Sequence, residues 1–98
     1  MRLFWSAKAK SDLQEIGDFI AKDSPDNARM HIKKLIERAK QAVQFPGSGR
    51  IVPEFRDEKI REFILENYRI VYLVNTNNKT VTIITVFESH ALISNRIK

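Results

Sequence analysis

The sequence predicts a two-layer α+β fold, in which an N-terminal strand and an antiparallel helical hairpin pack on an antiparallel β-sheet. In the first half of the chain, apolar residues recur at helical spacing. In the second half, runs rich in Ile, Val, Thr, Tyr and Phe are separated by short turns. The chain has 98 residues, 43% of them hydrophobic, which is enough for one core but not for two. We therefore expect a single domain over residues 1–98.

The first expected elements are a short strand over residues 2–5, RLFW, and a helix that Ser6 caps at its N-terminus. One stripe of this helix is apolar and consists of Ala9, Leu13, Ile16 and Ile20. These positions are three or four residues apart, so they share one helix face. We expect the helix to end near Lys22.

A second helix is expected to begin at the segment KDSPDNA. Ser24 is a suitable N-cap, Pro25 fits the first helical position, and Asp26 favours the positive helix start. The apolar stripe of this helix consists of Ala28, Ile32, Leu35, Ile36, Ala39 and Val43. The segment Phe45-Pro46-Gly47 should end it. Because only a few residues join the two helices, they must run antiparallel.

The remainder of the chain is expected to form strands. An antiparallel meander is predicted from residues 60–66, 68–75 and 80–87, which are separated by the turn segments EN and NTNNK. Residues 51–55 can add a further short strand, although Pro53 would hold it to an edge or a bulge.

The helical hairpin covers one face of the predicted sheet and leaves the other open to solvent or to a partner. The segment GSGR, residues 47–50, lies at the crossing from the helices to the sheet. We expect its glycines to adopt backbone conformations that other residues resist. Arg50 and Glu54 should then lie at one rim of the open face.

Composition narrows the class of protein. The absence of Cys excludes disulfides and thiolate metal sites, and two histidines offer little support for a metal or other cofactor. No segment has the apolar run of a signal peptide or the ~20 apolar residues of a membrane span, so we expect a soluble cytoplasmic protein. Lys and Arg number 17 against 12 acidic residues, a net charge of +5. This charge favours an anionic partner, such as nucleic acid or an acidic protein.

Three arginines lie on or beside the predicted strands: Arg50, Arg61 and Arg69. One interpretation is ion pairing with Glu54, Glu62 or Glu66, and the other is binding of a target or a phosphate. A two-residue turn at Glu66-Asn67 would place Arg61 and Arg69 on opposite faces of the sheet, whereas a three-residue turn would place them on one face. The sequence leaves both registers open. Arg69 interrupts the apolar run YRIVYLV, so it requires either a carboxylate partner or a target.

Other side chains could take part in proton transfer. His90 follows the last predicted strand and could act as a general acid or base near neutral pH, although a surface histidine is the simpler interpretation. Glu54 could accept a proton, although solvated carboxylates are commoner. His31 on the second helix is expected to be an ordinary exposed residue.

The segments AKSDLQEIGDFIAKDSPDNA, FPGSGRIVPEF, IREFILENYRIVYLV and VTIITVFESH resemble the RelE/ParE superfamily of toxins from type II toxin-antitoxin systems. The most specific parts are FP-x-SGR-x-VPE and the hairpin around NYRIVY. The resemblance covers nearly the whole chain and implies the same fold of a helical hairpin on a compact sheet. It also implies a growth-arresting toxin, of the kind that stabilises plasmids, which an acidic antitoxin neutralises in a hetero-oligomeric complex.

Two activities are known for relatives of this kind. RelE-like toxins are endoribonucleases that cut messenger RNA on the ribosome, which would make Glu54 the base, Arg61 and Arg69 phosphate binders, and His90 the acid. ParE-like toxins inhibit DNA gyrase by binding, which would make Arg50, Arg61 and Arg69 target-binding residues. A non-toxic protein-binding module is a third interpretation.

Two departures favour the ParE-like interpretation. Lys59 is the only lysine between Lys40 and Lys79, whereas RelE proper has clustered lysines, and Ala91 follows His90 where related chains often have an arginine. The long helical hairpin and the SGR-x-VPE segment also resemble ParE more closely. We therefore expect a gyrase inhibitor in preference to a ribonuclease.

Overall fold

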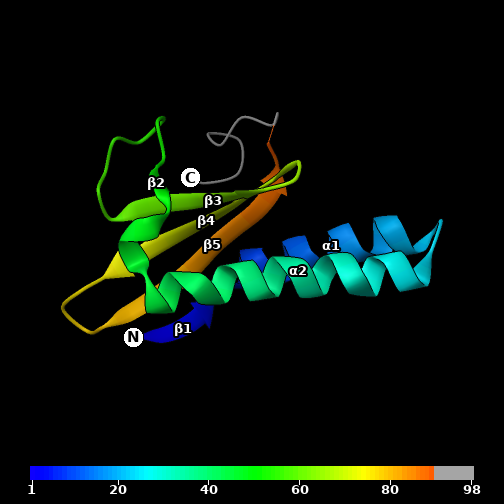
Figure 1. Cartoon of the computed structure of the whole chain (residues 1–98), viewed down its shortest axis with the longest axis horizontal. Coiled ribbons are helices and arrows are strands. Elements are labelled where there is room, and N and C mark those ends of the chain that lie inside the picture. Colours follow the sequence, from blue (N-terminus) through cyan, green and yellow to red (C-terminus); the bar gives the residue numbers. More distant parts are fainter. Residues whose placement is uncertain (90–98) are drawn as a thin grey trace.

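The elements follow one another as predicted, with one additional 3-10 turn. A computed structural model describes residues 1–89 and contains β1 (Arg2–Trp5), α1 (Ala7–Ala21), α2 (Pro25–Gln44), η1 (Pro46–Ser48), β2 (Arg50–Ile51), β3 (Ile60–Leu65), β4 (Tyr68–Asn75) and β5 (Thr80–Glu88). The helices run side by side, and the tip of their hairpin projects beyond the sheet (Figure 1). The α+β fold class is confirmed. Neither helix of this part of the chain combines the length and the apolar character that a bilayer crossing requires.

The sheet has the strand order β1-β5-β4-β3-β2, and its strands from β2 to β5 are antiparallel as expected. β1 adds a feature that the prediction did not include, because it pairs with β5 in parallel and makes the sheet mixed. Parallel neighbours need a long crossover connection, and the segment between these strands begins with the helical hairpin. Ser6 joins the two strands at the end of β1, since its amide donates a hydrogen bond to the Ile83 carbonyl (3.0 Å).

Both helix starts are confirmed. The Ser6 hydroxyl accepts a hydrogen bond from the Ala9 amide (2.9 Å), and the Ser24 hydroxyl accepts one from the Asn27 amide (3.2 Å). Each bond satisfies one of the amides that a helix N-terminus leaves without a partner. α2 ends at Gln44, directly before the segment Phe45-Pro46-Gly47, as its sequence predicts.

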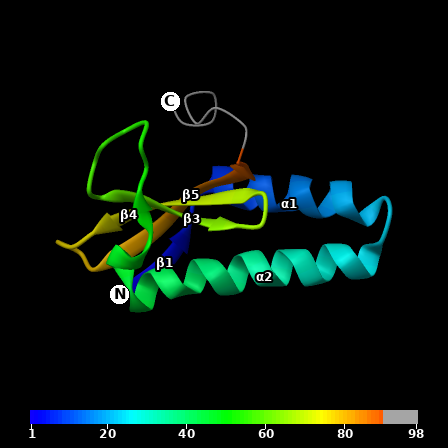
Figure 2. The same cartoon turned by 45° about the horizontal axis from the view of Figure 1, so that its top comes forward.

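The main core lies between the helices and the sheet. Its buried members are Ala9, Leu35, Ala39, Ala42, Phe63, Tyr68, Ile70, Tyr72, Val74, Val81, Ile83 and Val86. Leu13, Ile16 and Ile32 of the predicted stripes pack against this core but are only partly buried. The projecting hairpin explains this, because its outer part packs helix on helix without the sheet beneath it (Figure 2).

Asp12 is a buried acid that the predicted stripe of α1 did not include. Its side chain is 1% exposed, and it accepts hydrogen bonds from the Thr85 hydroxyl (2.5 Å) and the Val86 amide (3.0 Å). The pairing of β4 with β5 shifts register between Val71 and Tyr72. The residue of β5 that this shift leaves without a partner in β4 is Ile84, next to Thr85. Asp12 thereby attaches α1 to the irregular part of β5.

The sheet face opposite the helices, which we call the open face, is partly covered by the chain itself. Of the predicted strand over residues 51–55, only Ile51 lies in a strand, β2. The chain then turns back at Val52, whose carbonyl accepts hydrogen bonds from the Phe55 and Arg56 amides (both 3.1 Å). Pro53 has no amide with which to continue the ladder. Val52 and Phe55 pack with residues of β4 and β5 in a second apolar cluster, which consists of Val52, Val71, Phe87, Phe55, Ile60 and Ile84.

The glycines of the GSGR segment have a different role from the one expected. No glycine within residues 1–89 has a positive φ, and Gly49 is extended (φ −75°, ψ 153°). Gly49 is required by close contact instead, because a Cβ there would lie 2.4 Å from the Tyr72 hydroxyl and 2.8 Å from the Glu62 carbonyl oxygen. A Cβ at Gly47 would have no neighbour within 4 Å.

These two glycines supply a matched pair of substitutions. We expect Gly49→Ala to lower the free energy of unfolding by about 1–3 kcal/mol, because the added methyl group displaces Tyr72 or the β3 backbone. Gly47→Ala should change it by less than about 0.5 kcal/mol, since nothing fills that space. Urea denaturation of both variants measures the difference. Equal effects at the two positions would contradict the close contact at Gly49.

Candidate functional site

Four charged side chains form a continuous network on the open face, which we call the Arg-Glu network: Arg50, Glu62, Arg69 and Glu54. The Arg50 Nε donates to the Glu62 Oε2 (2.5 Å), and the Arg69 Nε donates to the Glu62 Oε1 (2.5 Å). The Arg69 Nη1 and Nη2 donate to the Glu54 Oε2 and Oε1 (2.9 and 3.0 Å). Glu62 thus joins two arginines, and Arg69 joins two glutamates.

Strand pairing explains how these residues meet. Arg50 of β2 lies directly opposite Glu62 of β3. Arg69 of β4 lies opposite Ile64, two residues from Glu62 and therefore on the same face. Glu54 comes from the turn that follows β2, where the Val52 packing brings the chain back over the sheet.

Burial differs sharply along the network. The side chains of Glu62 and Arg69 are 0% and 6% exposed, while those of Glu54 and Arg50 are 37% and 58% exposed. Hydrogen bonds from Arg69 hold the pKa of Glu54 below its ordinary value, although partial burial opposes the shift. The hydrogen bonds to Glu54 raise the pKa of Arg69, against the desolvation of its guanidinium. Both groups are therefore charged at neutral pH.

Arg69 and Glu54 are already bound to each other, so neither is readily available to bind a substrate or to transfer a proton. All three nitrogens of the Arg69 guanidinium donate to carboxylates, and its carbon lies 5.3 Å from the centre of the Phe87 ring. A carboxylate with a lowered pKa that is already bound to an arginine is a weak proton acceptor. Arg50 is the exposed cation of the network.

Arg61 lies away from this network. β3 and β4 are joined by the two-residue turn Glu66-Asn67, which pairs Leu65 with Tyr68 and places Arg61 and Arg69 on opposite faces. The turn is sharp, and Glu66 has φ 55°. In this register the two arginines do not form a joint phosphate site.

Arg61 instead holds the crossing between α2 and β2. Its Nη1 donates to the Gly49 carbonyl (2.9 Å), and its Nε donates to the Glu58 carbonyl (3.1 Å). Tyr72, which lies opposite Arg61, binds the same crossing: its hydroxyl donates to the Pro46 carbonyl (2.8 Å) and accepts from the Gly49 amide (3.0 Å). Burial raises the pKa of Tyr72, so the phenol remains protonated.

Tyr72 makes contacts that were not expected from the sequence, and Glu62 was expected only as an ion-pair partner of the strand arginines. For Glu62 a signal existed, since an acid in the apolar run IREFIL requires a partner just as Arg69 does. Tyr72 resembles an ordinary core aromatic in sequence, and only the close approach of Gly49 shows its hydrogen-bonding role.

The expectation that His31 is exposed is wrong. Its side chain is 19% exposed, because its ring packs edge-on against Tyr68 at 5.1 Å. Its Nδ1 lies 3.5 Å from the Glu66 carboxylate in the β3–β4 turn, which also lies 3.5 Å from the Lys34 Nζ. His90 lies outside the described residues. Among residues 1–89, the His, Asp and Glu side chains form no cluster suited to a metal ion.

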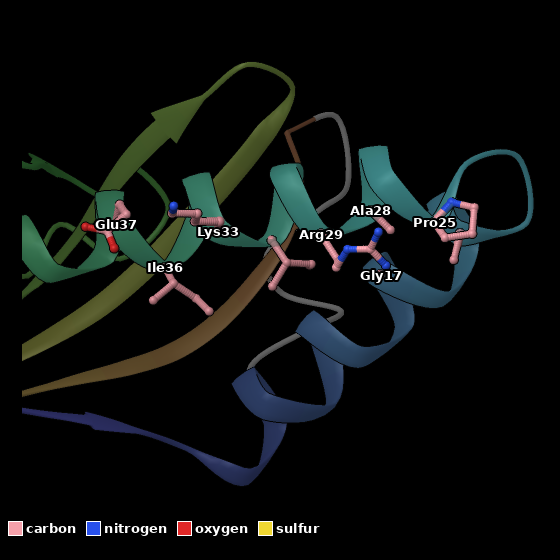
Figure 3. Close-up of a pocket in the computed structure, with 9 residues that line it drawn as sticks. Gly17, Pro25, Ala28, Arg29, Lys33, Ile36 and Glu37 are labelled. Carbon is pink, nitrogen blue, oxygen red and sulfur yellow. The ribbon is translucent and has the colours of Figure 1, made fainter.

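A groove of about 500 Å³ runs between the two helices (Figure 3). Its lining is mostly apolar with charged groups at the rim, and consists of Gly17, Ala21, Pro25, Ala28, Arg29, Ile32, Lys33, Ile36 and Glu37. A Cβ at Gly17 would lie 3.5 Å from the Ile32 side chain, an ordinary van der Waals contact. The groove is thus a surface separate from the Arg-Glu network.

Removal of Arg69 should be costly for stability. We expect Arg69→Ala to lower the free energy of unfolding by about 3–5 kcal/mol, because it leaves the buried Glu62 and its charge without that partner. Arg69→Lys should recover only part of the loss, since an ammonium group cannot reproduce the planar fork. Denaturant titration of purified variants measures both.

Arg29→Ala is the matched control for Arg69→Ala. It removes an exposed arginine that pairs with the exposed Asp26, so it should cost less than about 1 kcal/mol. If Arg69→Ala were as mild as this control, Arg69 would have no structural role and would instead be available to a target.

The pair of Glu54 with Arg69 should make stability depend on pH. Because the pKa of Glu54 is lowered on folding, its contribution is present above its ordinary pKa of 4.5 and is lost as the pH falls through the folded value. We expect Glu54→Gln to lower the free energy of unfolding by about 0.5–1.5 kcal/mol at pH 7, a small range because this carboxylate is 37% exposed to screening solvent, and by less at pH 3. Denaturation of both proteins across this range is the measurement, and a constant difference would contradict the prediction.

Comparison with known proteins agrees with this fold. Residues 3–91 match the family described as the ParE toxin of the type II toxin-antitoxin system parDE. A protein of Sinorhizobium fredii (strain NGR234) named "Putative toxin Y4kP" is 32% identical over 91 residues, which cover 91% of this chain and 88% of the relative.

Solved structures share the architecture. The chromosomal ParDE system of P. aeruginosa superposes with a TM-score of 0.74 at 24% identity, covering 90% of this chain and 95% of the other. The isolated RelE toxin of E. coli gives a TM-score of 0.66 at 14% identity, covering 96% and 89%. The match over nearly the whole described chain shows that this protein belongs to the ParE toxin family of type II toxin-antitoxin systems, within the RelE/ParE superfamily.

Proposed function

We propose that this toxin arrests growth by binding and inhibiting DNA gyrase, and that a cognate acidic antitoxin neutralises it. The observation that carries the proposal is the state of Arg69, whose guanidinium is fully engaged by Glu54 and Glu62 within the protein. The open face then offers a surface for binding rather than a set of groups for cleavage.

RNA cleavage through the ribose 2′-hydroxyl needs a base, an acid and a cation that stabilises negative charge. On the open face, Glu54 has a lowered pKa and is paired with Arg69, so neither residue is available in its expected nuclease role. Arg61, the second expected phosphate binder, lies on the other face. These three placements support inhibition by binding.

The antitoxin is proposed to bind through the helical hairpin. The groove between the helices has an apolar floor, and Arg29 and Lys33 lie at its rim (Figure 3). An amphipathic segment with acidic residues beside its apolar face would complement both features. The net charge of +5 favours the same partner, because opposite charges speed association and raise specificity.

Two assays on the purified protein test the proposed target. We expect the protein to inhibit DNA supercoiling by gyrase in proportion to its concentration, and to leave messenger RNA intact on translating ribosomes. The control is the same protein mixed with its antitoxin, which should restore supercoiling. Inhibition that persists in the presence of the antitoxin would contradict the proposed neutralisation.

The opposite pair of results would identify a ribosome-dependent nuclease. Cleavage of messenger RNA on ribosomes, with supercoiling unaffected, would overturn the gyrase proposal. It would also require that the pair between Arg69 and Glu54 opens on the ribosome, because both groups are engaged in the free protein. Failure in both assays, with normal growth of cells that produce the protein alone, would favour a non-toxic binding module.

A further inference from the structure

We propose that Arg50 recognises a carboxylate on the surface of the protein target, and that Glu62 and Arg69 are positioning residues that hold its guanidinium for this contact. The inference rests on the proposed function, since it names the group through which the open face would bind gyrase. The two arginines of the Arg-Glu network thus have different roles: the exposed Arg50 contacts the target, and the buried Arg69 positions Arg50 through Glu62.

Arg50 combines exposure with a fixed attachment. Its side chain is 58% exposed, and its Nε donates to the Glu62 carboxylate at 2.5 Å. Within residues 1–89, neither of its terminal nitrogens donates a hydrogen bond to the protein. The end of the guanidinium is therefore available, and its planar geometry suits two parallel hydrogen bonds to a carboxylate.

The attachment point is itself immobilised. Glu62 is fully buried, and its second oxygen accepts a hydrogen bond from Arg69, which Glu54 holds from the other side. The backbone beside Arg50 is also held, because the Gly49 amide donates to the Tyr72 hydroxyl at 3.0 Å. A free arginine loses much side-chain entropy when it is ordered in a complex, and an anchored one loses less.

The surroundings of Arg50 favour a protein carboxylate over a nucleic-acid phosphate. The network contains two arginines and two glutamates, so its net charge is zero, and the partly exposed Glu54 would repel a row of phosphates. Nucleic-acid sites rely on several cations together. Ile64, which is 44% exposed, lies on the same face of β3 as Glu62. An exposed arginine beside apolar surface is typical of protein interfaces.

The alternative role for Arg50 is to neutralise Glu62 and nothing more. Lysine at position 50 separates the two roles, because it can neutralise the buried carboxylate but cannot form the bidentate fork. A purely structural Arg50 would be replaced by lysine without loss of binding. A recognition role predicts a folded Arg50→Lys protein that binds the target weakly.

The experiment measures binding to purified gyrase, inhibition of supercoiling and the thermal midpoint for the full chain. The variants are Arg50→Ala, Arg50→Lys, Glu62→Gln and the double variant Arg50→Ala with Glu62→Gln. The matched control is Arg56→Ala, which removes the same charge from the neighbouring loop, where the arginine is exposed and has no carboxylate partner within residues 1–89.

We expect Arg50→Ala and Arg50→Lys to raise the Kd for gyrase about 10-fold or more, and Arg56→Ala to change it less than about twofold. Glu62→Gln should weaken binding as well. If Glu62 acts through Arg50, the double variant should bind no more weakly than the weaker of its two single variants. A merely structural Glu62 would instead give losses that multiply.

The outcomes separate this inference from the function on which it rests. If the unsubstituted protein neither binds nor inhibits gyrase, the proposed function is overturned and the inference with it. If it inhibits gyrase while a folded Arg50→Lys protein binds within twofold of it, only the inference is overturned. Should Arg50→Ala or Glu62→Gln fail to fold, Arg50→Lys decides. If the unsubstituted protein cleaves RNA and the folded Arg50→Lys protein does not, Arg50 binds a phosphate and the inference is overturned.

Discussion

The burial of Arg69 is the constraint on which much of the structure depends. A guanidinium in the middle of an apolar strand is very unfavourable unless carboxylates replace its hydration. Glu62 supplies one from the adjacent strand, and Glu54 supplies the other only if the chain after β2 folds back over the sheet. The turn, its contacts through Val52, and the partial closure of the open face are therefore linked to one charged side chain.

The turn after β2 also determines which charged groups of the open face remain exposed for binding. The Arg-Glu network has four charged groups within residues 1–89, and the pairing of Arg69 with two of them leaves Arg50 as the exposed cation of the network. A fold of this kind can host different activities, because activity depends on the side chains of the site rather than on the architecture. The ParDE and RelE structures share this architecture at low identity.

The molecule has two separate surfaces of different character. The groove of the helical hairpin lies toward the projecting tip, where the helices pack on each other without the sheet (Figures 1 and 3). The Arg-Glu network lies on the opposite side of the sheet from the helices. The groove is apolar with charged residues at its rim, whereas the Arg-Glu network is polar and its buried groups are paired with each other. The two surfaces therefore differ in chemistry as well as in position.

The amino-acid sequence by itself determined the features that depend on near neighbours along the chain. The caps at Ser6 and Ser24, the ends of the helices and the strand runs rest on local hydrogen bonds and on periodicity, so they were predictable. Tertiary structure decided what depends on distant segments. The pairing of β3 with β4 separates Arg61 from Arg69, the fold places Glu62 between two arginines, and Tyr72 leaves no room for a side chain at position 49. A one-residue change of register moves every side chain of a strand to the other face of the sheet. Local sequence does not encode which atoms of distant segments will come into contact.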